Sequence, residues 1–168
     1  GREKLQWTKA IKLELKALRT NHTWDIIRKP RGAKLISTRW CFRKKLNSDG
    51  TIRYKARLVA RGFTQRKGFE YFKTYAPTLS LSSLRILLAL FTQYGLSSHN
   101  IDIDNAYLYG QIDTDIYLSI PQGFHLDENN CQTNEGHSCL HLNKSIYGLK
   151  QSGHIFYETF AKTLKQIG

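Results

Sequence analysis

The feature that most constrains the fold is a pair of strand-like runs joined by a turn that contains Asp49 and Gly50. Apolar and polar residues alternate over positions 36–42, and a second run rich in strand-forming residues covers positions 51–60. Because Asp-Gly is a favoured pair in tight turns between antiparallel strands, we expect the two runs to form a β-hairpin. The fold must therefore accommodate at least one antiparallel pair of strands.

The predicted hairpin is strongly basic. The two-residue period of a strand places Arg53, Lys55 and Arg57 on one face and their apolar neighbours on the other. Three cations in a row repel one another unless an anion meets them, and a triphosphate or a nucleic-acid backbone would do so. The alternative is an ordinary solvated surface, and the pattern alone does not decide between the two. The other cations of the hairpin and its ends are Arg43, Lys44, Lys45 and Arg61.

Charge is unevenly divided along the chain, whose net charge is +13. Residues 1–75 hold 21 of the 26 lysines and arginines and five acidic residues, a net charge of +16, whereas residues 76–168 carry −3. Blocks of one sign point to binding partners more than to fold. The basic half suits a polyanion, and the plainer alternative is a solvated basic surface.

Length and composition set broader limits. A chain of 168 residues is long enough for one globular domain with a sizeable core. It starts with Gly1 and contains no methionine, so we expect it to be a segment of a longer product. Three cysteines, an odd number at uneven spacing, favour a reducing compartment. The sequence has no secretory signal and no apolar run of about 18 residues, so we expect no membrane anchor.

Three helices are expected outside the hairpin. Apolar residues recur at helical spacing over positions 7–18 and again over 156–167. A helix between them is expected to be capped by Ser82 and Ser83 and to end at Gly95. Together with further strands, this order predicts an α+β fold, an antiparallel sheet with packed helices in two lobes, of which the basic lobe closes over a substrate. The remaining strand-like segments are 96–103, 113–120 and 140–142, with a polar loop over 127–138.

Asp102 stands at the end of the apolar run 96–103, and Tyr107 follows a few positions later. An acid that leaves a strand can hold a divalent metal ion while a nearby aromatic ring forms the wall of a sugar pocket. Two-metal phosphoryl transfer needs several such carboxylates, because ions about 3.5 to 4 Å apart must both be fixed. Asp102 is therefore the candidate ligand, but it cannot serve alone. Asp104 would share its face in a continuing strand, or would instead begin a turn and cap a helix.

A second group of metal-binding residue types lies towards the end of the polar stretch. Cys131, His137, Cys139 and His141 are all zinc ligands by chemistry. Their spacing matches none of the usual paired patterns of structural zinc sites, so no zinc site is predicted. His154, on the last predicted helix, has no visible nucleophile or acid partner and is interpreted as a surface or core residue.

A series of motifs extends across nearly the whole chain. It begins with the basic hairpin and continues beyond Asp102. The main motifs are Trp-Cys-Phe-Arg-Lys-Lys at 40–45, Arg-Tyr-Lys-Ala-Arg-Leu-Val-Ala-Arg-Gly-Phe-Thr-Gln at 53–65, Tyr-Ala-Pro at 75–77, Ile-Asp-Ile at 101–103, Ala-Tyr-Leu-Tyr-Gly at 106–110, Pro-Gln-Gly-Phe at 121–124 and Lys-Ser-Ile-Tyr-Gly-Leu-Lys-Gln-Ser at 144–152. In order and spacing these motifs resemble the reverse transcriptase of copia-type LTR retrotransposons (Pseudoviridae).

The resemblance implies part of a right-hand polymerase, with fingers over residues 1–80 and the front of the palm over 81–168. It implies an RNA-directed DNA polymerase, a nucleotidyltransferase that uses two Mg²⁺ ions in the intact enzyme. The implied partners are an RNA template, a DNA primer-template, deoxynucleoside triphosphates (dNTPs), and the rest of the polyprotein, namely the remaining palm, thumb and RNase H. Such elements make DNA for integration, in a cytoplasmic virus-like particle or in the nucleus.

The resemblance also assigns roles to residues. Asp102 matches the first metal-binding aspartate, and the backbone of Ile103 touches the metal or the triphosphate. Tyr107 matches the aromatic residue beneath the incoming sugar, which excludes a 2′-hydroxyl. Lys45 and Arg57 resemble the cations that grip the triphosphate, and Lys55, on the same strand face as Arg57, is a further candidate for nucleotide binding. The segment that supports nucleotide and template supplies Tyr147, Gly148 and Lys150.

The sequence departs from the family pattern in two places. The other two metal carboxylates of the family lie in a Tyr-x-Asp-Asp hairpin, and these 168 residues contain no Asp-Asp pair. Catalysis by these residues alone is therefore not expected, and the alternative function is a catalytically inactive, nucleic-acid-binding remnant, truncated or domesticated. Phe156 stands where many relatives have Trp, a conservative change on an apolar face.

Overall fold

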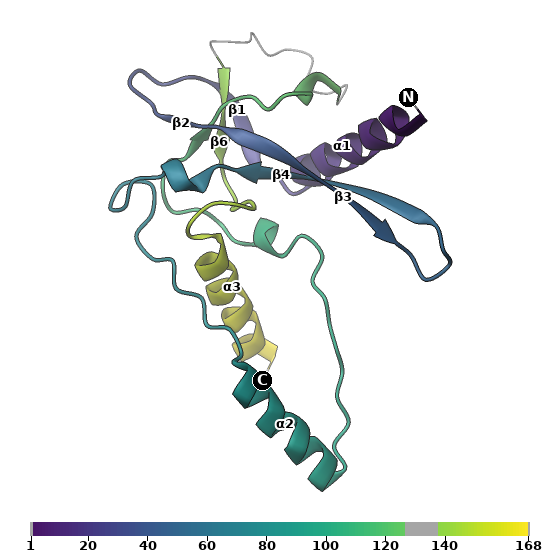
Figure 1. Ribbon diagram of the computed structural model, residues 1–168. Helices are drawn as coiled ribbons and strands as arrows, with labels where there is room; N and C mark the ends of the chain where they lie inside the picture. Colours follow the sequence, from purple (N-terminus) through teal and green to yellow (C-terminus); the bar gives the residue numbers. More distant parts are fainter. Residues whose placement is uncertain (1, 127–137, 168) are drawn as a thin grey trace.

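The computed structural model describes residues 2–126 and 138–167 (Figure 1). The described part contains three α-helices, six strands and three short 3₁₀-helices, and it confirms the α+β class. In chain order these are α1 (Arg2–Thr20), β1 (Trp24–Arg28), β2 (Leu35–Ile36), β3 (Thr38–Leu46), β4 (Ile52–Ala60), η1 (Gly62–Thr64), α2 (Leu81–Tyr94), η2 (Ala106–Tyr109), β5 (Tyr117–Leu118), η3 (Phe124–Leu126), β6 (Ser138–Leu142) and α3 (Ser152–Ile167).

The strands form a four-stranded sheet in the order β1-β6-β5-β2 and the separate hairpin β3-β4. Strand β6 pairs antiparallel with β1 and with β5, but β2 and β5 run parallel. The prediction of a purely antiparallel sheet was therefore wrong. Parallel strands need a long crossover connection, and here the chain between β2 and β5 passes through the hairpin and α2, a connection that residue patterning does not reveal.

The hairpin prediction is confirmed. Strands β3 and β4 pair in continuous register from Thr38 opposite Ala60 to Leu46 opposite Ile52. At the turn, the Asp49 carboxylate accepts hydrogen bonds from the backbone N–H of Thr51 at 2.9 Å and from its hydroxyl at 2.6 Å. Gly50 adopts a φ of 80°, a left-handed conformation that favours glycine.

The core lies where α1 packs against the inner face of β4 and the four-stranded sheet. The helical spacing predicted over 7–18 is confirmed, because α1 buries Leu15 and Leu18 against Ile36 and Leu58. Each such side chain contributes roughly 1.5–3 kcal/mol when it is removed from water. Strand β4 is therefore fixed from one side by α1, which leaves its other face available.

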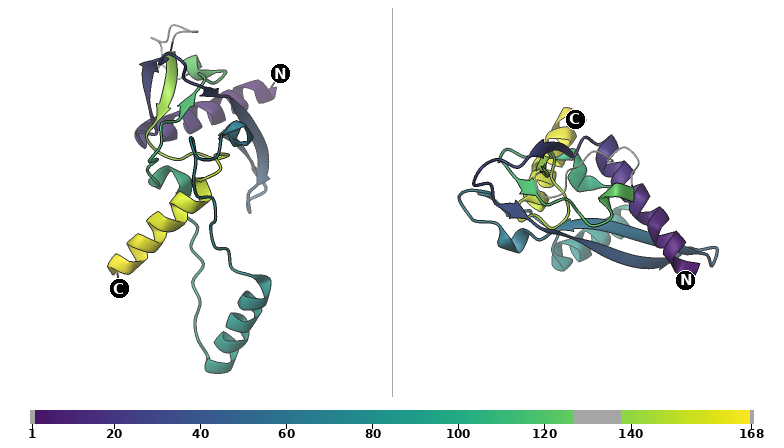
Figure 2. Two further views of the ribbon diagram at one scale, coloured as in Figure 1. Left: turned by 90° about the vertical axis from the view of Figure 1, so that its left-hand side faces the viewer. Right: turned by 90° about the horizontal axis from the view of Figure 1, so that it is seen from above.

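Helix α2 extends away from this core, at the far end of two long connecting segments (Figure 2). Its N-cap is Ser80, whose hydroxyl accepts from the Ser83 N–H at 3.1 Å, so the cap predicted at Ser82 and Ser83 was placed too late. The predicted end at Gly95 is confirmed, with φ 61°. None of the residues of α2 is buried.

The predicted strand over 96–103 was wrong, because the chain has no regular structure there. A strand requires a neighbour for its backbone hydrogen bonds, and among the described residues no sheet edge pairs with this segment. Ile101 is 82% exposed, so the apolar run does not enclose Asp102.

The later elements follow the predictions more closely. Helix α3 confirms the last predicted helix and begins at Ser152. The extended segment 113–120 is reduced to the two residues of β5, and 140–142 belongs to β6. The predicted polar loop over 127–138 lies outside the described residues except at its end. None of the helices in the described parts combines the length and apolarity that crossing a membrane requires.

Candidate nucleotide-binding site

Strand β4 has the two faces that its sequence predicted. Ala56, Leu58 and Ala60 are buried, whereas Lys55 and Arg57 on the opposite face are half-buried. The buried residues face the core, whereas Lys55 borders a cavity lined by α1 and β4 and Arg57 lies over the Tyr147 ring. The strand thus serves as a rigid support for the basic side chains.

Arg57 lies over the ring of Tyr147, with its guanidinium carbon 4.6 Å from the ring centroid. Its Nε atom is buried and has no hydrogen-bond partner among the described residues. A buried, unsatisfied donor is costly to the folded state. Burial raises the pKa of Tyr147, and the Arg57 charge opposes that rise. The phenol therefore stays neutral beside the cation at ordinary pH.

Tyr107 completes an aromatic cluster with Tyr147. The two rings meet edge to face at 4.8 Å, and Phe156 of α3 lies 6.1 Å from Tyr107 on another side. The Ser145 hydroxyl donates a hydrogen bond of 2.5 Å to the Tyr107 carbonyl, which fixes η2 against the chain before Tyr147. We name Arg57, Tyr107 and Tyr147 the β4 cluster.

The two acids near this cluster are placed differently. Asp102 is exposed, and its charge adds to the rise in the pKa of Tyr147 that burial causes, so it lies within electrostatic range of the cluster. Asp104 lies in the turn before η2 and lines, with Lys55 and Glu14, a cavity of about 230 Å³ between α1 and β4. The cap position of η2 is Asn105, with no side-chain hydrogen bond, so Asp104 begins a turn but does not cap.

Lys55 is a half-buried cation that lies close to several other positive charges of the hairpin. Its pKa is lowered by burial first and then by the charges of Arg57, Lys45 and Arg53, with Asp104 opposing the shift. Lys45 itself is exposed near the hairpin tip, opposite Arg53. Such mutual repulsion favours binding of an anion across the strand.

Gly148 and Lys150 lie on the far side of the cluster, where two backbone segments cross. Gly148 has a φ of 92°, and a Cβ atom there would lie 2.1 Å from the Ala60 carbonyl oxygen. A Cβ on Gly62 would in turn lie 2.1 Å from the Gly148 oxygen. The absence of a side chain at Gly148 therefore permits close approach of backbone. The backbone that approaches it is that of β4 and of the segment after β4. Ile103, half-buried, precedes the Asp104 turn.

Buried amides, which the sequence did not single out, hold this crossing together. Gln65 donates to the Gln151 side chain at 3.0 Å and accepts from the Lys150 N–H at 2.8 Å, while Gln151 donates to the Glu70 carbonyl at 2.8 Å. Both glutamines fall inside family-like motifs, which was the only signal available. Their burial depends on contacts between residues about 85 positions apart.

A basic cavity of about 490 Å³ opens beside the crossing. Its residues include an exposed aromatic ring, Phe63, which is 73% exposed. Three cations surround it, namely Arg39, Arg61 and Lys150. An accessible ring among cations suits stacked bases and a phosphate backbone.

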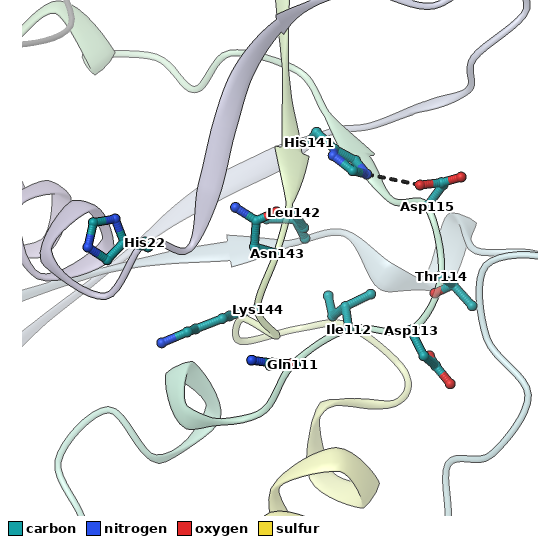
Figure 3. Close-up of a pocket in the computed structure, with 10 residues that line it drawn as sticks. All are labelled: His22, Gln111, Ile112, Asp113, Thr114, Asp115, His141, Leu142, Asn143 and Lys144. Atoms are coloured by element: carbon teal, nitrogen blue, oxygen red, sulfur yellow. Dashed lines mark hydrogen bonds and ion pairs between the residues drawn. The ribbon is translucent and has the colours of Figure 1, made fainter.

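A further pocket of about 550 Å³ lies at the end of β6 (Figure 3). In it the Nε2 atom of His141 lies 3.0 Å from the Asp115 carboxylate, and Tyr117 stacks on the His141 ring at 5.0 Å. His141 is thus paired with a carboxylate and covered by an aromatic ring. Cys139 is buried, and burial raises the pKa of its thiol, whereas Cys131 and His137 lie outside the described residues.

The prediction that His154 has no acid partner was wrong. Its Nε2 atom lies 3.1 Å from the Glu158 carboxylate, one helical turn along α3. Its Nδ1 atom lies 2.7 Å from the Tyr75 carbonyl oxygen. The contacts join α3 to the chain before α2 and indicate a structural role.

The described residues do not by themselves fit a two-metal site. Over residues 2–126 and 138–167, no group of three or more histidine, cysteine, aspartate and glutamate side chains is placed to hold a metal ion. Asp102 supplies one carboxylate, and Asp104 faces Lys55. Two ions need more oxygen ligands than one carboxylate provides.

Comparison with known proteins places the chain in a family. A model described as reverse transcriptase (RNA-dependent DNA polymerase) matches residues 21–168. The chain belongs to this reverse transcriptase family, which confirms the resemblance. No solved structure matches the chain significantly.

Relatives that match nearly the whole chain include retrotransposon polyproteins. Over 97% of its length the chain is 38% identical to the retrovirus-related Pol polyprotein from transposon RE1 of Arabidopsis thaliana and 34% identical to that from transposon TNT 1-94 of Nicotiana tabacum. Over 99% it is 34% identical to the Gag-Pol polyprotein of transposon Ty1-H of Saccharomyces cerevisiae. The chain spans only 11%, 12% and 9% of these proteins.

Proposed function

We propose that the chain is the fingers and front palm of an RNA-directed DNA polymerase, with fingers over 1–80 and palm over 81–168. In this proposal the β4 cluster binds an incoming dNTP. The observation that carries it is the Arg57 side chain, held half-buried against the Tyr147 ring beside the other cations of the hairpin. Triphosphate oxygens would accept charge-assisted hydrogen bonds from its guanidinium group.

The neighbouring residues fit the other parts of a nucleotide. Lys55 and Lys45 extend the cationic row along the hairpin towards its tip and would neutralise the outer phosphates. Tyr107, fixed between Tyr147 and Phe156, would lie beneath the sugar and exclude a 2′-hydroxyl. The repulsion within the cationic row gives these residues a reason to bind a polyanion tightly.

Asp102, with the Ile103 backbone beside it, would supply one ligand to Mg²⁺. When bound, such ions lower the charge on the phosphates and activate the primer 3′-hydroxyl. Since the described residues offer one carboxylate, the further ligands are proposed to come from other parts of the polyprotein, together with the remaining palm, thumb and RNase H.

The basic cavity around Phe63 is proposed to bind the template. Its ring would stack on a base, while Arg39, Arg61 and Lys150 contact the phosphates. Gly148 sits between this cavity and the β4 cluster, so nucleotide and template would meet across the backbone crossing. RNA template and DNA primer-template are thus the proposed partners, in a cytoplasmic virus-like particle or in the nucleus.

Primer extension by the proposed parent polyprotein tests this function. Asp102→Asn should abolish extension, while Tyr107→Ala should keep it and admit ribonucleotides. Asp113→Asn is a matched control, because Asp113 lies in the pocket at the end of β6. Extension unaffected by Asp102→Asn, or reduced equally by Asp113→Asn, would contradict the proposal.

A second candidate is a catalytically inactive, nucleic-acid-binding remnant, favoured because residues 2–126 and 138–167 contain no group of three or more acidic, histidine or cysteine side chains placed to hold a metal ion. In that case Asp102→Asn would leave the affinity for a primer-template nearly unchanged. Substitution of Lys55 or Arg57 would still flatten its salt dependence. A loss of affinity confined to Asp102→Asn would exclude the remnant.

A further inference from the structure

Glu14 differs from most other charged residues of α1 in facing the hairpin and not the solvent. It is half-buried, and its carboxylate accepts a hydrogen bond of 3.2 Å from the backbone N–H of Leu58. Leu58 directly follows Arg57 in β4. The helix therefore holds the strand at the residue next to the proposed phosphate ligand.

The carboxylate also interacts with the charges of the site. Burial raises the pKa of Glu14, whereas the Leu58 N–H, Arg57 and Lys55 oppose the rise. Its charge in turn adds to the elevated pKa of Tyr147. Glu14 thus lies within electrostatic range of both members of the Arg57–Tyr147 contact.

We propose that Glu14 is a positioning residue that holds Arg57 over the Tyr147 ring, ready for a triphosphate. The inference rests on the proposed nucleotide-binding function and extends it to α1, which precedes the residues 21–168 matched by the family model. Glu14 contacts no substrate in this proposal. It acts through the Leu58 backbone and through its charge.

Arg57 needs such support because its surroundings repel it. Lys55 lies on the same face of the strand and interacts unfavourably with Arg57, and the buried Nε makes no hydrogen bond in the described structure. A cation over an aromatic ring gains only about 0.5–2 kcal/mol. The half-buried Glu14 carboxylate interacts favourably with both Arg57 and Lys55 and so offsets this repulsion.

Glu14→Gln separates charge from hydrogen bonding, because Gln keeps an oxygen that accepts from the Leu58 N–H. Glu3→Gln is the matched control. Glu3 lies on the same helix and forms an ion pair with a hairpin cation, Lys44, at 2.6 Å, but both side chains are well exposed. Arg57→Gln shows the effect of losing the cation altogether.

The first measurement is the ionisation of Tyr147 in the ligand-free chain, followed by ultraviolet absorbance against matched Tyr147→Phe proteins. If Glu14→Gln releases Arg57 from the ring, the loss of the cation outweighs the loss of the carboxylate, and the pKa of Tyr147 rises as it does in Arg57→Gln. If Arg57 stays in place, only the carboxylate is lost and that pKa falls. A fall, or no change relative to Glu3→Gln, would overturn the proposal.

The second measurement is the affinity for dTTP. Removing a negative charge should by itself strengthen binding of a polyanion, so weaker binding can only come from lost positioning. We expect Glu14→Gln to weaken dTTP binding roughly fivefold relative to Glu3→Gln. Equal or tighter binding would overturn the proposal. If the unsubstituted chain binds no dTTP, the nucleotide-binding function fails, while the Tyr147 titration still decides whether Glu14 positions Arg57.

Discussion

The two halves of the candidate site are held in very different ways. Arg57, Tyr107 and Tyr147 contact one another above a buried strand, beside a glycine crossing and a network of buried amides. Asp102 instead ends an arm, residues 77–102, in which no residue is buried (Figure 2). The proposed phosphate-binding half is therefore built from contacts within these residues, whereas nothing in the described parts of the chain fixes the proposed metal-binding half.

Substitution of a glycine in each region should give the largest difference in stability between the two regions. Gly148→Ala places a Cβ within 2.1 Å of the Ala60 oxygen at a φ of 92°, and we expect a loss of about 4 kcal/mol or more in the free energy of unfolding. Gly95→Ala, at φ 61° with nothing within 4 Å, should cost about 1 kcal/mol. Urea denaturation of both variants measures these losses in the free energy of unfolding. Equal losses would contradict the difference between the two regions.

Leucine truncation should give the next largest difference. Leu58 is 1% exposed in the core, so Leu58→Ala should cost about 2–5 kcal/mol. Leu87 of α2 is 40% exposed, and Leu87→Ala should cost less than about 0.5 kcal/mol. Thermal unfolding of the two variants checks the pair. A large loss from Leu87→Ala would mean that the arm packs against the body.

The amide network should have a smaller effect. Gln65→Leu removes the acceptor of the Lys150 N–H and the donor to Gln151, which leaves buried polar groups unpaired. We expect a loss of about 1–3 kcal/mol. Gln93→Leu, on an exposed position of α2, is the control. Hydrogen exchange at Lys150 should accelerate in Gln65→Leu, and unchanged protection would argue against the network.

The smallest effect is a pH dependence from Glu14. Because burial raises its pKa in the folded state, the folded chain binds more protons than the unfolded chain just above the ordinary value of 4.5. The contribution of Glu14 to the free energy of unfolding is therefore fully present below that ordinary pKa value. It is lost as the pH rises through the raised pKa of the folded state. Glu14→Gln should therefore gain stability relative to the unsubstituted chain between pH 4 and 7. A loss of stability of Glu14→Gln relative to the unsubstituted chain over that pH range would contradict this prediction.

Sequence patterns predicted those features of the fold that depend on residues close together in the chain. The hairpin with its Asp-Gly turn and the helical segments 7–18 and 156–167 follow from periodicity and turn chemistry, although α1 and α3 both begin earlier than these segments. The strand over 96–103 failed because pairing depends on a neighbour, which spacing cannot supply. The parallel pair β2 and β5 was missed for the same reason.

The candidate site was predicted only in part. Family resemblance pointed to Arg57, Tyr107 and Tyr147, and the structure brings these three together. Glu14 and Gln65 were missed, because a carboxylate on a basic helix and an amide after a turn look solvated in sequence. Their importance comes from burial against segments far along the chain.

The central claim is that the β4 cluster binds a triphosphate, and dTTP titration of the 168-residue chain tests it most directly. Arg57→Gln should weaken binding roughly tenfold or more, because a charge-assisted hydrogen bond is worth about 1.5–3 kcal/mol. Arg85→Gln removes the same charge from the exposed α2 and should have little effect. Equal weakening by both substitutions, or none by Arg57→Gln, would contradict the claim.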